Sequence, residues 1–175
     1  MIFVAGGSQK FPFDRLIEGL DRLLEEGTLK EEVFAQTGAC TYVPRNMKSV
    51  DFLDSSAFSE KIRQCSLMIV HAGTGAITAG LTAGKPIIVV PRIATYGEHV
   101  DDHQFMIARR FAQESYVVCV EDMEQLGAAI QKIESTPLRP YENDSVAIQT
   151  YLCDFIDGNI QARRGKRLAK TTRDV

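Results

Sequence analysis

The sequence predicts a single α/β domain with a parallel sheet and helices on both faces. Short apolar runs of strand length alternate along the chain with segments whose apolar residues recur at helical spacing. Several of these runs, such as residues 67–70 and 87–90, are apolar throughout instead of alternating with polar residues. Strands of that kind are buried on both faces, which is typical of a parallel sheet between two layers of helices. The length of 175 residues also suits one domain.

The first half of the chain contains four expected strands and two expected helices. The strands lie at residues 2–5, 33–36, 50–53 and 67–70. Between the first two strands, apolar residues recur at helical spacing from Phe13 to Leu24, and Gly27 ends the pattern. Asp54 is placed to cap a short helix before the fourth strand.

The second half of the chain continues the same alternation. A helix of small residues follows the segment HAGTG and ends near Ala83, where the sequence Gly-Lys-Pro breaks it. Asp122, with Gln125 three residues later, resembles a capping box at the start of another helix. The remaining expected strands lie at 87–90 and 116–120, and the remaining helices at about 102–113, 122–134 and 148–156.

Charge separates the end of the chain from the rest. The net charge is −3, yet residues 159–175 carry six basic side chains and one acid. We therefore expect a domain over residues 1–157 and a basic C-terminal tail over residues 158–175. A tail of this kind is usually solvated, and contact with an anionic membrane surface or an acidic partner is the alternative.

Composition places the chain among ordinary globular proteins and excludes collagen-like, disordered and disulfide-scaffold classes. No apolar run approaches the roughly 20 residues that span a bilayer, and the apolar stretch at residues 1–7 is shorter than we expect of a signal peptide. The four cysteines form no C-x-x-C pair, so we expect reduced thiols in a cytoplasmic protein.

Two glycine-rich segments follow expected strands directly. GGSQ contains Gly6, Gly7 and Ser8, and HAGTG contains Gly73, Thr74 and Gly75. In open parallel sheets, ligands bind beyond the carboxyl ends of the strands. Each segment is expected to lead directly into a helix, whose free N–H groups and dipole suit phosphate. Glycines that only make tight turns are the alternative for either segment alone, but two such loops at one edge favour a phosphate site.

A histidine and an acidic segment lie beside these loops. His71 either caps its loop from a buried position or contacts the ligand directly. Residues 98–104 bring together Glu98, His99, Asp101, Asp102, His103 and Gln104. Solvated charges at a helix start and a metal site on His99 and His103 are the alternatives there, although a third metal ligand is missing. Hydroxyl groups of a sugar fit these carboxylates and the amide better.

The motifs GGSQ, HAGTG, GKPIIVVP and D-x-H-Q, in this order, resemble the C-terminal, donor-binding half of family 28 glycosyltransferases. The resemblance covers about residues 1–157. It is greatest to the small split members of the family, which are PssE-type exopolysaccharide subunits and the catalytic subunit of the dolichol-pathway N-acetylglucosaminyltransferase. The segments QKFPFDRL and YGEHVDDHQ look particularly PssE-like.

This resemblance implies a single Rossmann-like domain that is half of a GT-B fold and transfers a hexose from a UDP-sugar with inversion. It also implies that no metal or other cofactor is needed, because the UDP-sugar is a substrate. By motif match, Gly6, Gly7, Ser8, His71, Gly73, Thr74 and Gly75 would face the diphosphate, and Asp102, His103 and Gln104 the donor sugar. Glu98 and His99 are the candidates for a catalytic base.

Two positions depart from the family pattern. Many relatives have a ribose-binding glutamate eight residues after the histidine, where this chain has Ala79, and Lys10 replaces a glycine after GGSQ. Ribose recognition would then fall to Glu98 or to backbone groups.

The chain has the size of only one half of a GT-B enzyme, so the resemblance implies a partner. That partner would be a membrane-anchored subunit that binds a lipid-linked saccharide in capsule or exopolysaccharide synthesis. It would recruit this chain to the inner face of the membrane, and no nucleic acid is expected to bind. A noncatalytic nucleotide-sugar-binding module is the alternative function, and a metal-dependent hydrolase is a more distant one.

Overall fold

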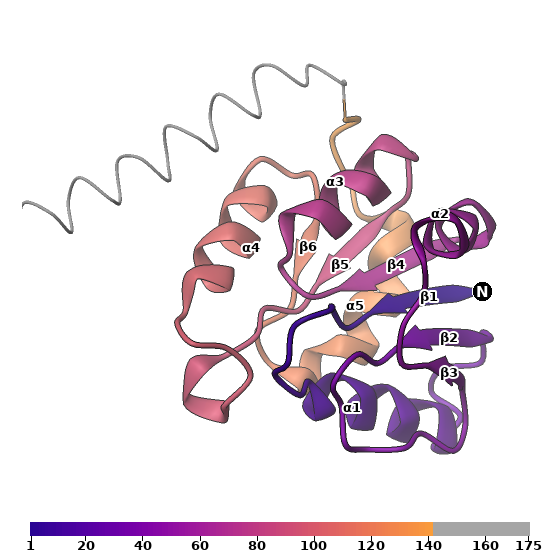
Figure 1. Ribbon diagram of the computed structural model, residues 1–175. Helices are drawn as coiled ribbons and strands as arrows, with labels where there is room; N and C mark the ends of the chain where they lie inside the picture. The colour runs from indigo at the N-terminus through magenta and orange to yellow at the C-terminus, as the bar shows by residue number, and fades with distance from the viewer. Residues whose placement is uncertain (142–175) are drawn as a thin grey trace, which may run out of the picture. The chain divides into compact units, whose positions relative to one another are not determined.

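The protein, seen here in a computed structural model that describes residues 1–141, has one six-stranded sheet (Figure 1). Its strand order is β3-β2-β1-β4-β5-β6, and every neighbouring pair is parallel. The strands are β1 (Ile2–Ala5), β2 (Val33–Gln36), β3 (Lys48–Val50), β4 (Leu67–Val70), β5 (Ile87–Val89) and β6 (Val118–Cys119). The predicted fold class is therefore confirmed.

Helices cover both faces of this sheet. They are α1 (Asp14–Glu25), α2 (Ser55–Gln64), α3 (Thr74–Thr82), α4 (His103–Gln113) and α5 (Leu126–Lys132). Short 3₁₀ turns are η1 (Ala94–Tyr96), η2 (Met123–Gln125) and η3 (Ile133–Ser135). As expected, the Asp54 carboxylate caps α2 by accepting a hydrogen bond from the N–H of Ala57 at 2.8 Å.

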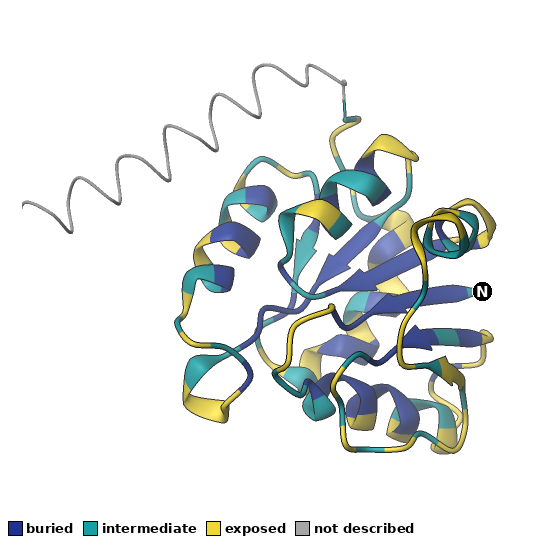
Figure 2. Ribbon diagram, in the orientation of Figure 1, coloured by how far each residue is buried: buried dark blue, intermediate teal, exposed yellow. Residues whose placement is uncertain are grey.

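The central strands β1, β4 and β5 are buried (Figure 2), and two apolar cores lie on opposite faces of the sheet. Ile2 and Val4 of β1 pack in one core with α1 and α5, whereas Phe3 and Ala5 pack in the other with α2, α3 and α4. Because successive strand residues point to opposite faces, a central strand between two cores must be apolar at every position. The uninterrupted apolar runs at β1, β4 and β5 follow from this requirement.

The strand order places a topological switch between β1 and β4. From β1 the chain runs outward through β2 to β3, and from β4 it runs outward in the other direction through β5 to β6. Ala5 pairs with Val70 at the carboxyl ends of β1 and β4. In sheets of this kind, ligands bind in the crevice beyond the carboxyl ends at such a switch.

The edge strands differ from the predicted ones. β3 covers Lys48–Val50 and not residues 50–53, and β6 covers two residues and not 116–120. Lys48 and Ser49 are exposed, and Phe52, which was expected in a strand, is exposed beyond the end of β3. An edge strand is held by its backbone pairing on one side, so it does not need an apolar run.

Two helix starts also differ from the sequence prediction. Four residues separate the GGSQ segment from Asp14, the first residue of α1, so this helix does not begin directly after the glycines. Asp122 accepts a hydrogen bond from the N–H of Glu124 and starts the turn η2, and α5 follows it. In contrast, α3 begins at Thr74 with Gly73 as its N-cap, as expected.

A lysine at the opposite edge of the sheet stabilises α2. The ammonium group of Lys85 donates hydrogen bonds to the carbonyl oxygens of Arg63 and Cys65, at 2.9 and 2.7 Å. These carbonyls lie at the C-terminal end of α2, where a positive charge is favourable. Lys85 therefore belongs to the Gly-Lys-Pro sequence that follows α3 and also binds the end of α2, about 20 positions earlier in the chain.

The expected helix over residues 148–156, the domain boundary at 157 and the basic tail lie outside the described residues. Among residues 1–141, no helix is both long enough and apolar enough to cross a membrane. Cys40, Cys65 and Cys119 are free thiols, of which Cys65 is buried.

Candidate functional site

Three loops meet at the carboxyl edge of the sheet, beyond β1, β4 and β5. The first contains Gly6 and Gly7, the second runs from His71 to Gly73, and the third begins at Pro91. The N–H of His71 donates to the carbonyl of Ala5 at 3.2 Å, and the N–H of Val90 donates to that of Val70 at 2.9 Å. The structure therefore brings together the segments that the sequence assigned to one edge.

The first two loops approach each other around the ring of His71. Gly7 has a φ of +106°, which favours glycine, and a Cβ at this position would lie 3.1 Å from His71 Nε2. A Cβ at Gly73 would lie only 2.3 Å from the same nitrogen. We call Gly6, Gly7, His71 and Gly73 the glycine cradle. Side chains at Gly7 and Gly73 would collide with the imidazole, so this packing needs glycine at both positions.

The cradle presents unpaired backbone donors. In the described part of the chain, the N–H groups of Gly7 and Ser8 have no hydrogen-bond partner in the protein. The same holds for the N–H groups of Thr74, Gly75 and Ala76 in the first turn of α3. Free donors on two adjacent loops, one of them a helix start, can bind an anion such as a phosphate.

His71 is neutral in this position. Its Nδ1 lies 3.1 Å from the carbonyl oxygen of Ala5, which can only accept, so Nδ1 carries the proton. Burial lowers the pKa of the imidazole to about 4, and the positive charge of Arg92 contributes, whereas the Ala5 hydrogen bond opposes the shift. Nε2 therefore bears a lone pair beside Gly7 and Gly73. A direct bond to an anion would require a proton on Nε2.

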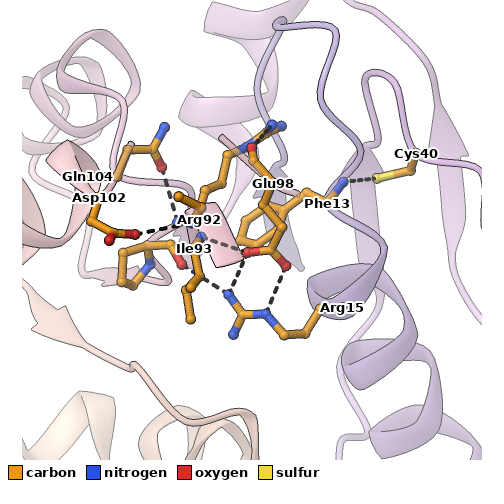
Figure 3. A network of polar contacts seen from close by, with 10 residues as sticks. Phe13, Arg15, Cys40, Arg92, Ile93, Glu98, Asp102 and Gln104 are labelled. Carbon is orange, nitrogen blue, oxygen red and sulfur yellow. Dashed lines mark hydrogen bonds and ion pairs between the residues drawn. The ribbon is translucent and has the colours of Figure 1, made fainter. Parts of the chain in front are cut away.

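A buried arginine connects the first loop with the third (Figure 3). The guanidinium of Arg92 donates to the carbonyl oxygens of Gly6 at 2.7 Å, Phe11 at 2.8 Å and Glu98 at 3.0 Å. Arg92 is 1% exposed, and burial lowers the pKa of its guanidinium, which nevertheless remains charged. No carboxylate among residues 1–141 forms an ion pair with it.

Glu98 forms a second connection between these loops. Its carboxylate accepts two hydrogen bonds from Arg15, both at 2.9 Å, and a third from the N–H of Ile93 at 2.8 Å (Figure 3). Glu98 is 4% exposed. Both carboxylate oxygens are thus occupied within the protein. This arrangement argues against Glu98 as a catalytic base or a ribose ligand and gives it a structural role instead.

The start of α4 carries the residues expected to bind a sugar. Gln104 is buried, and its Oε1 accepts a hydrogen bond from the N–H of Arg92 at 3.2 Å. Asp102 is exposed just before the helix, and its Oδ1 accepts from the N–H of Ala94 at 3.1 Å. The second carboxylate oxygen of Asp102 and the amide nitrogen of Gln104 form no hydrogen bond within residues 1–141. His103, the first residue of α4, is partly buried.

The two histidines of the third loop do not form a helical pair. His99 lies in the loop before α4, where its ring is 5.9 Å from that of Phe11 and its Nδ1 is 3.2 Å from the Asp101 carboxylate. Within residues 1–141, no three His, Cys, Asp or Glu side chains are grouped to hold a metal ion. Ala79 lies on α3, where it packs against the apolar core.

Sequence reasoning missed Arg92 and Arg15 as residues of this site. Arg92 comes two positions after the apolar run at residues 87–90, separated from it by Pro91, and a charge at that position was an available signal. Arg15 gave no such signal, because it lies in an amphipathic helix and its partner Glu98 is 83 positions away.

The strand order and the glycine cradle at the switch define a Rossmann-like α/β domain. Residues 1–157 match the glycosyltransferase family 28 C-terminal domain. The chain belongs to this family, and the resemblance seen in the sequence is thereby confirmed.

Relatives and solved structures agree with this assignment. The chain is 33% identical over 97 residues to "UDP-N-acetylglucosamine transferase subunit ALG13" of Saccharomyces cerevisiae, covering 54% of this chain and 46% of that protein. The subunit of the same name in Mus musculus is 31% identical over 87 residues, which are 47% of this chain and 7% of that protein. The matched region thus spans less than half of either relative.

Two solved structures have the same fold. MurG of Acinetobacter baumannii has a TM-score of 0.56 and 23% identity, with 76% of this chain and 40% of that chain covered. The solution structure of ALG13 has a TM-score of 0.53 and 23% identity, with 79% of this chain and 87% of that chain covered.

Proposed function

We propose that this chain is the donor-binding catalytic subunit of a heteromeric, inverting glycosyltransferase. It would transfer a hexose from a UDP-sugar to a lipid-linked saccharide in capsule or exopolysaccharide synthesis. The observation that carries the proposal is the glycine cradle with its unpaired N–H groups at the topological switch, next to the start of α4. The nearby relatives, whose names describe UDP-N-acetylglucosamine transferase subunits, support a UDP-sugar as donor.

The diphosphate would bind at the N–H groups of Gly7, Ser8, Thr74 and Gly75. These donors come from two loops, and the dipole of α3 adds positive potential at the second. His71 would not bind the diphosphate directly but would hold the two loops of the cradle together through its hydrogen bond to the carbonyl oxygen of Ala5. No metal or other cofactor is part of the proposal.

The donor sugar would bind at the start of α4. The free oxygen of Asp102 can accept a hydrogen bond from a sugar hydroxyl, and the amide nitrogen of Gln104 can donate one. His103 belongs to the same motif. The oxygen of Gln104 is held by Arg92, so the amide group already has a fixed orientation.

A second polypeptide would supply the acceptor and the base. Inverting transfer needs a base within hydrogen-bond reach of the acceptor hydroxyl, in line with the anomeric carbon. Since Arg15 and Ile93 occupy the Glu98 carboxylate, His99 remains the candidate from this chain. We propose that a membrane-anchored subunit binds the acceptor and brings this cytoplasmic chain to the inner face of the membrane.

A noncatalytic nucleotide-sugar-binding module is the alternative function. Ala79 and the occupied Glu98 favour it, because no carboxylate lies at the expected ribose-binding position of α3 and the carboxylate of Glu98 is not free to act as a base.

Binding and transfer measurements test both functions. Titration calorimetry should detect UDP binding by the purified chain at millimolar or lower concentration, and no binding of ADP or NAD. Sugar transfer to a lipid-linked acceptor should appear only when the partner is co-expressed. Absence of UDP binding would contradict both functions, and binding without transfer in the complex would favour the module. Equal turnover by the purified chain would show that no partner is needed.

The variant Gln104→Met tests the sugar site. It removes the amide donor without adding a charge beside Arg92, so binding of the UDP-sugar should weaken by about 1–3 kcal/mol. UDP alone should bind as to the wild type. The matched control is Gln113→Met at the exposed end of α4, which should change neither affinity. Equal losses for both ligands would assign Gln104 a purely structural role.

A further inference from the structure

Arg15, Arg92 and Glu98 form a buried charge cluster that contacts the glycine cradle through Arg92. The three groups are largely shielded from water: the exposed fraction of the side chain alone is 20% for Arg15 and 5% for Glu98, and Arg92 is buried. Arg15 pairs with Glu98, whereas the guanidinium of Arg92 forms hydrogen bonds with three carbonyl oxygens, lies over the face of the Phe13 ring and has no ion pair within residues 1–141. The cluster therefore carries one positive charge in excess.

Burying a charge without a counter-ion is costly, and the structure compensates for it only in part. Three carbonyl oxygens solvate two of the guanidinium nitrogens of Arg92, but its buried Nε has no hydrogen-bond partner among residues 1–141. The neighbouring His71 and Cys40 offer no negative charge. The pKa of His71 is lowered to about 4 by burial, so its ring is neutral, and burial raises the pKa of the Cys40 thiol to about 11.

The excess charge lies close to the expected diphosphate. The Nη2 atom of Arg92 bonds the carbonyl oxygen of Gly6 and lies 3.3 Å from the position of a Cβ on Gly7. This nitrogen thus lies close to the loop whose N–H groups at Gly7 and Ser8 are free, and a low-dielectric environment strengthens the field of the guanidinium there.

We infer that Arg92 is a positioning residue whose buried charge attracts the diphosphate through the glycine cradle without touching it. The inference rests on the proposed function, because it assumes an anionic ligand at this cradle. In this inference, the buried charge cluster increases the affinity for the ligand in addition to holding two loops together. Affinity for UDP should then follow the net charge of the cluster, and affinity for uncharged uridine should not.

Four variants test this inference by calorimetry with UDP and uridine at pH 8. R92M and R15M each remove one positive charge and should lower UDP affinity roughly tenfold or more. R92K keeps the charge and should bind UDP within a few fold of the wild type. E98Q removes the negative charge and should bind UDP at least as tightly as the wild type. Uridine affinity should stay constant throughout.

The opposite signs of these variants separate electrostatics from structure. If E98Q weakens UDP binding as R15M does, or if all variants weaken uridine and UDP equally, the inference is wrong. If R92M does not fold, the comparison of R15M with E98Q decides. A wild-type chain that binds neither ligand would refute the proposed function. If the wild type binds UDP but the variants bind it equally well whatever the net charge of the cluster, only this inference is refuted.

Discussion

At the scale of single residues, the functions of the polar groups depend on contacts between distant parts of the chain. The glycines of the cradle could be predicted, because a glycine directly after a buried strand marks a close approach of the backbone. The role of Glu98 could not, because its partner Arg15 lies 83 positions away on another element. A sequence shows that a carboxylate is present but not whether another side chain already occupies it.

His71 provides a test at this scale. Its pKa is lowered from 6.5 to about 4 because the folded protein buries the neutral ring. The unfolded chain therefore binds the extra proton first. The contribution of His71 to the free energy of unfolding is therefore complete above pH 6.5. It is lost as the pH falls toward 4, by up to about 3 kcal/mol.

The variant His71→Asn should flatten this pH dependence, because asparagine can donate to Ala5 but does not titrate. Urea denaturation between pH 7.5 and 4.5 measures the difference. The exposed neighbour Ser8 supplies the control, since Ser8→Ala should keep the wild-type slope. A wild-type slope in His71→Asn would mean that other groups cause the pH dependence.

At the scale of elements, burial decided which strands could be predicted. β1, β4 and β5 lie between two cores, and their uninterrupted apolar runs predicted them correctly as strands. β3 and β6 lie at the edges of the sheet, where each strand pairs with one neighbour only, and their bounds were wrong. Likewise, the contact between Lys85 and the end of α2 is tertiary, and local sequence gives no sign of it.

The hydrogen bonds of Lys85, at the amino edge of the sheet, predict that this side chain contributes to the stability of the fold. Lys85→Met removes two charge-assisted hydrogen bonds to the last carbonyls of α2, so unfolding should become about 1–2 kcal/mol easier. Lys30→Met, at an exposed loop position, should change stability by less than about 0.5 kcal/mol. Urea denaturation at pH 7 compares the two variants. No loss of stability in Lys85→Met would show that the lysine contributes nothing as a cap.

At the scale of the whole molecule, the strand order explains why three separate motifs form one site. β1, β4 and β5 are adjacent and parallel, so the loops after them meet at one edge whatever their separation in sequence. The sequence predicted the common edge from the parallel fold class alone. The interlocking of the first and third loops through Arg92 and Glu98 appeared only in three dimensions.

The distribution of charge along the chain predicts a separate role for the tail. Residues 159–175 carry six basic side chains, whereas the chain as a whole has a net charge of −3. Each basic residue near an anionic membrane contributes about 1 kcal/mol, so the tail has enough charge for reversible binding. The glycine cradle lies in residues 1–141 and does not include the tail.

Removal of residues 159–175 should therefore abolish binding to vesicles that contain a mixture of anionic and neutral phospholipids, while the affinity for UDP stays unchanged. The full chain should sediment with these vesicles at low salt and be released at high salt, since screening weakens surface electrostatics. Vesicles of neutral phospholipid alone provide the control and should bind neither form. Equal sedimentation of the full and shortened chains with anionic vesicles would exclude the tail as a membrane contact. A parallel loss of UDP binding would instead show that the tail supports the domain itself.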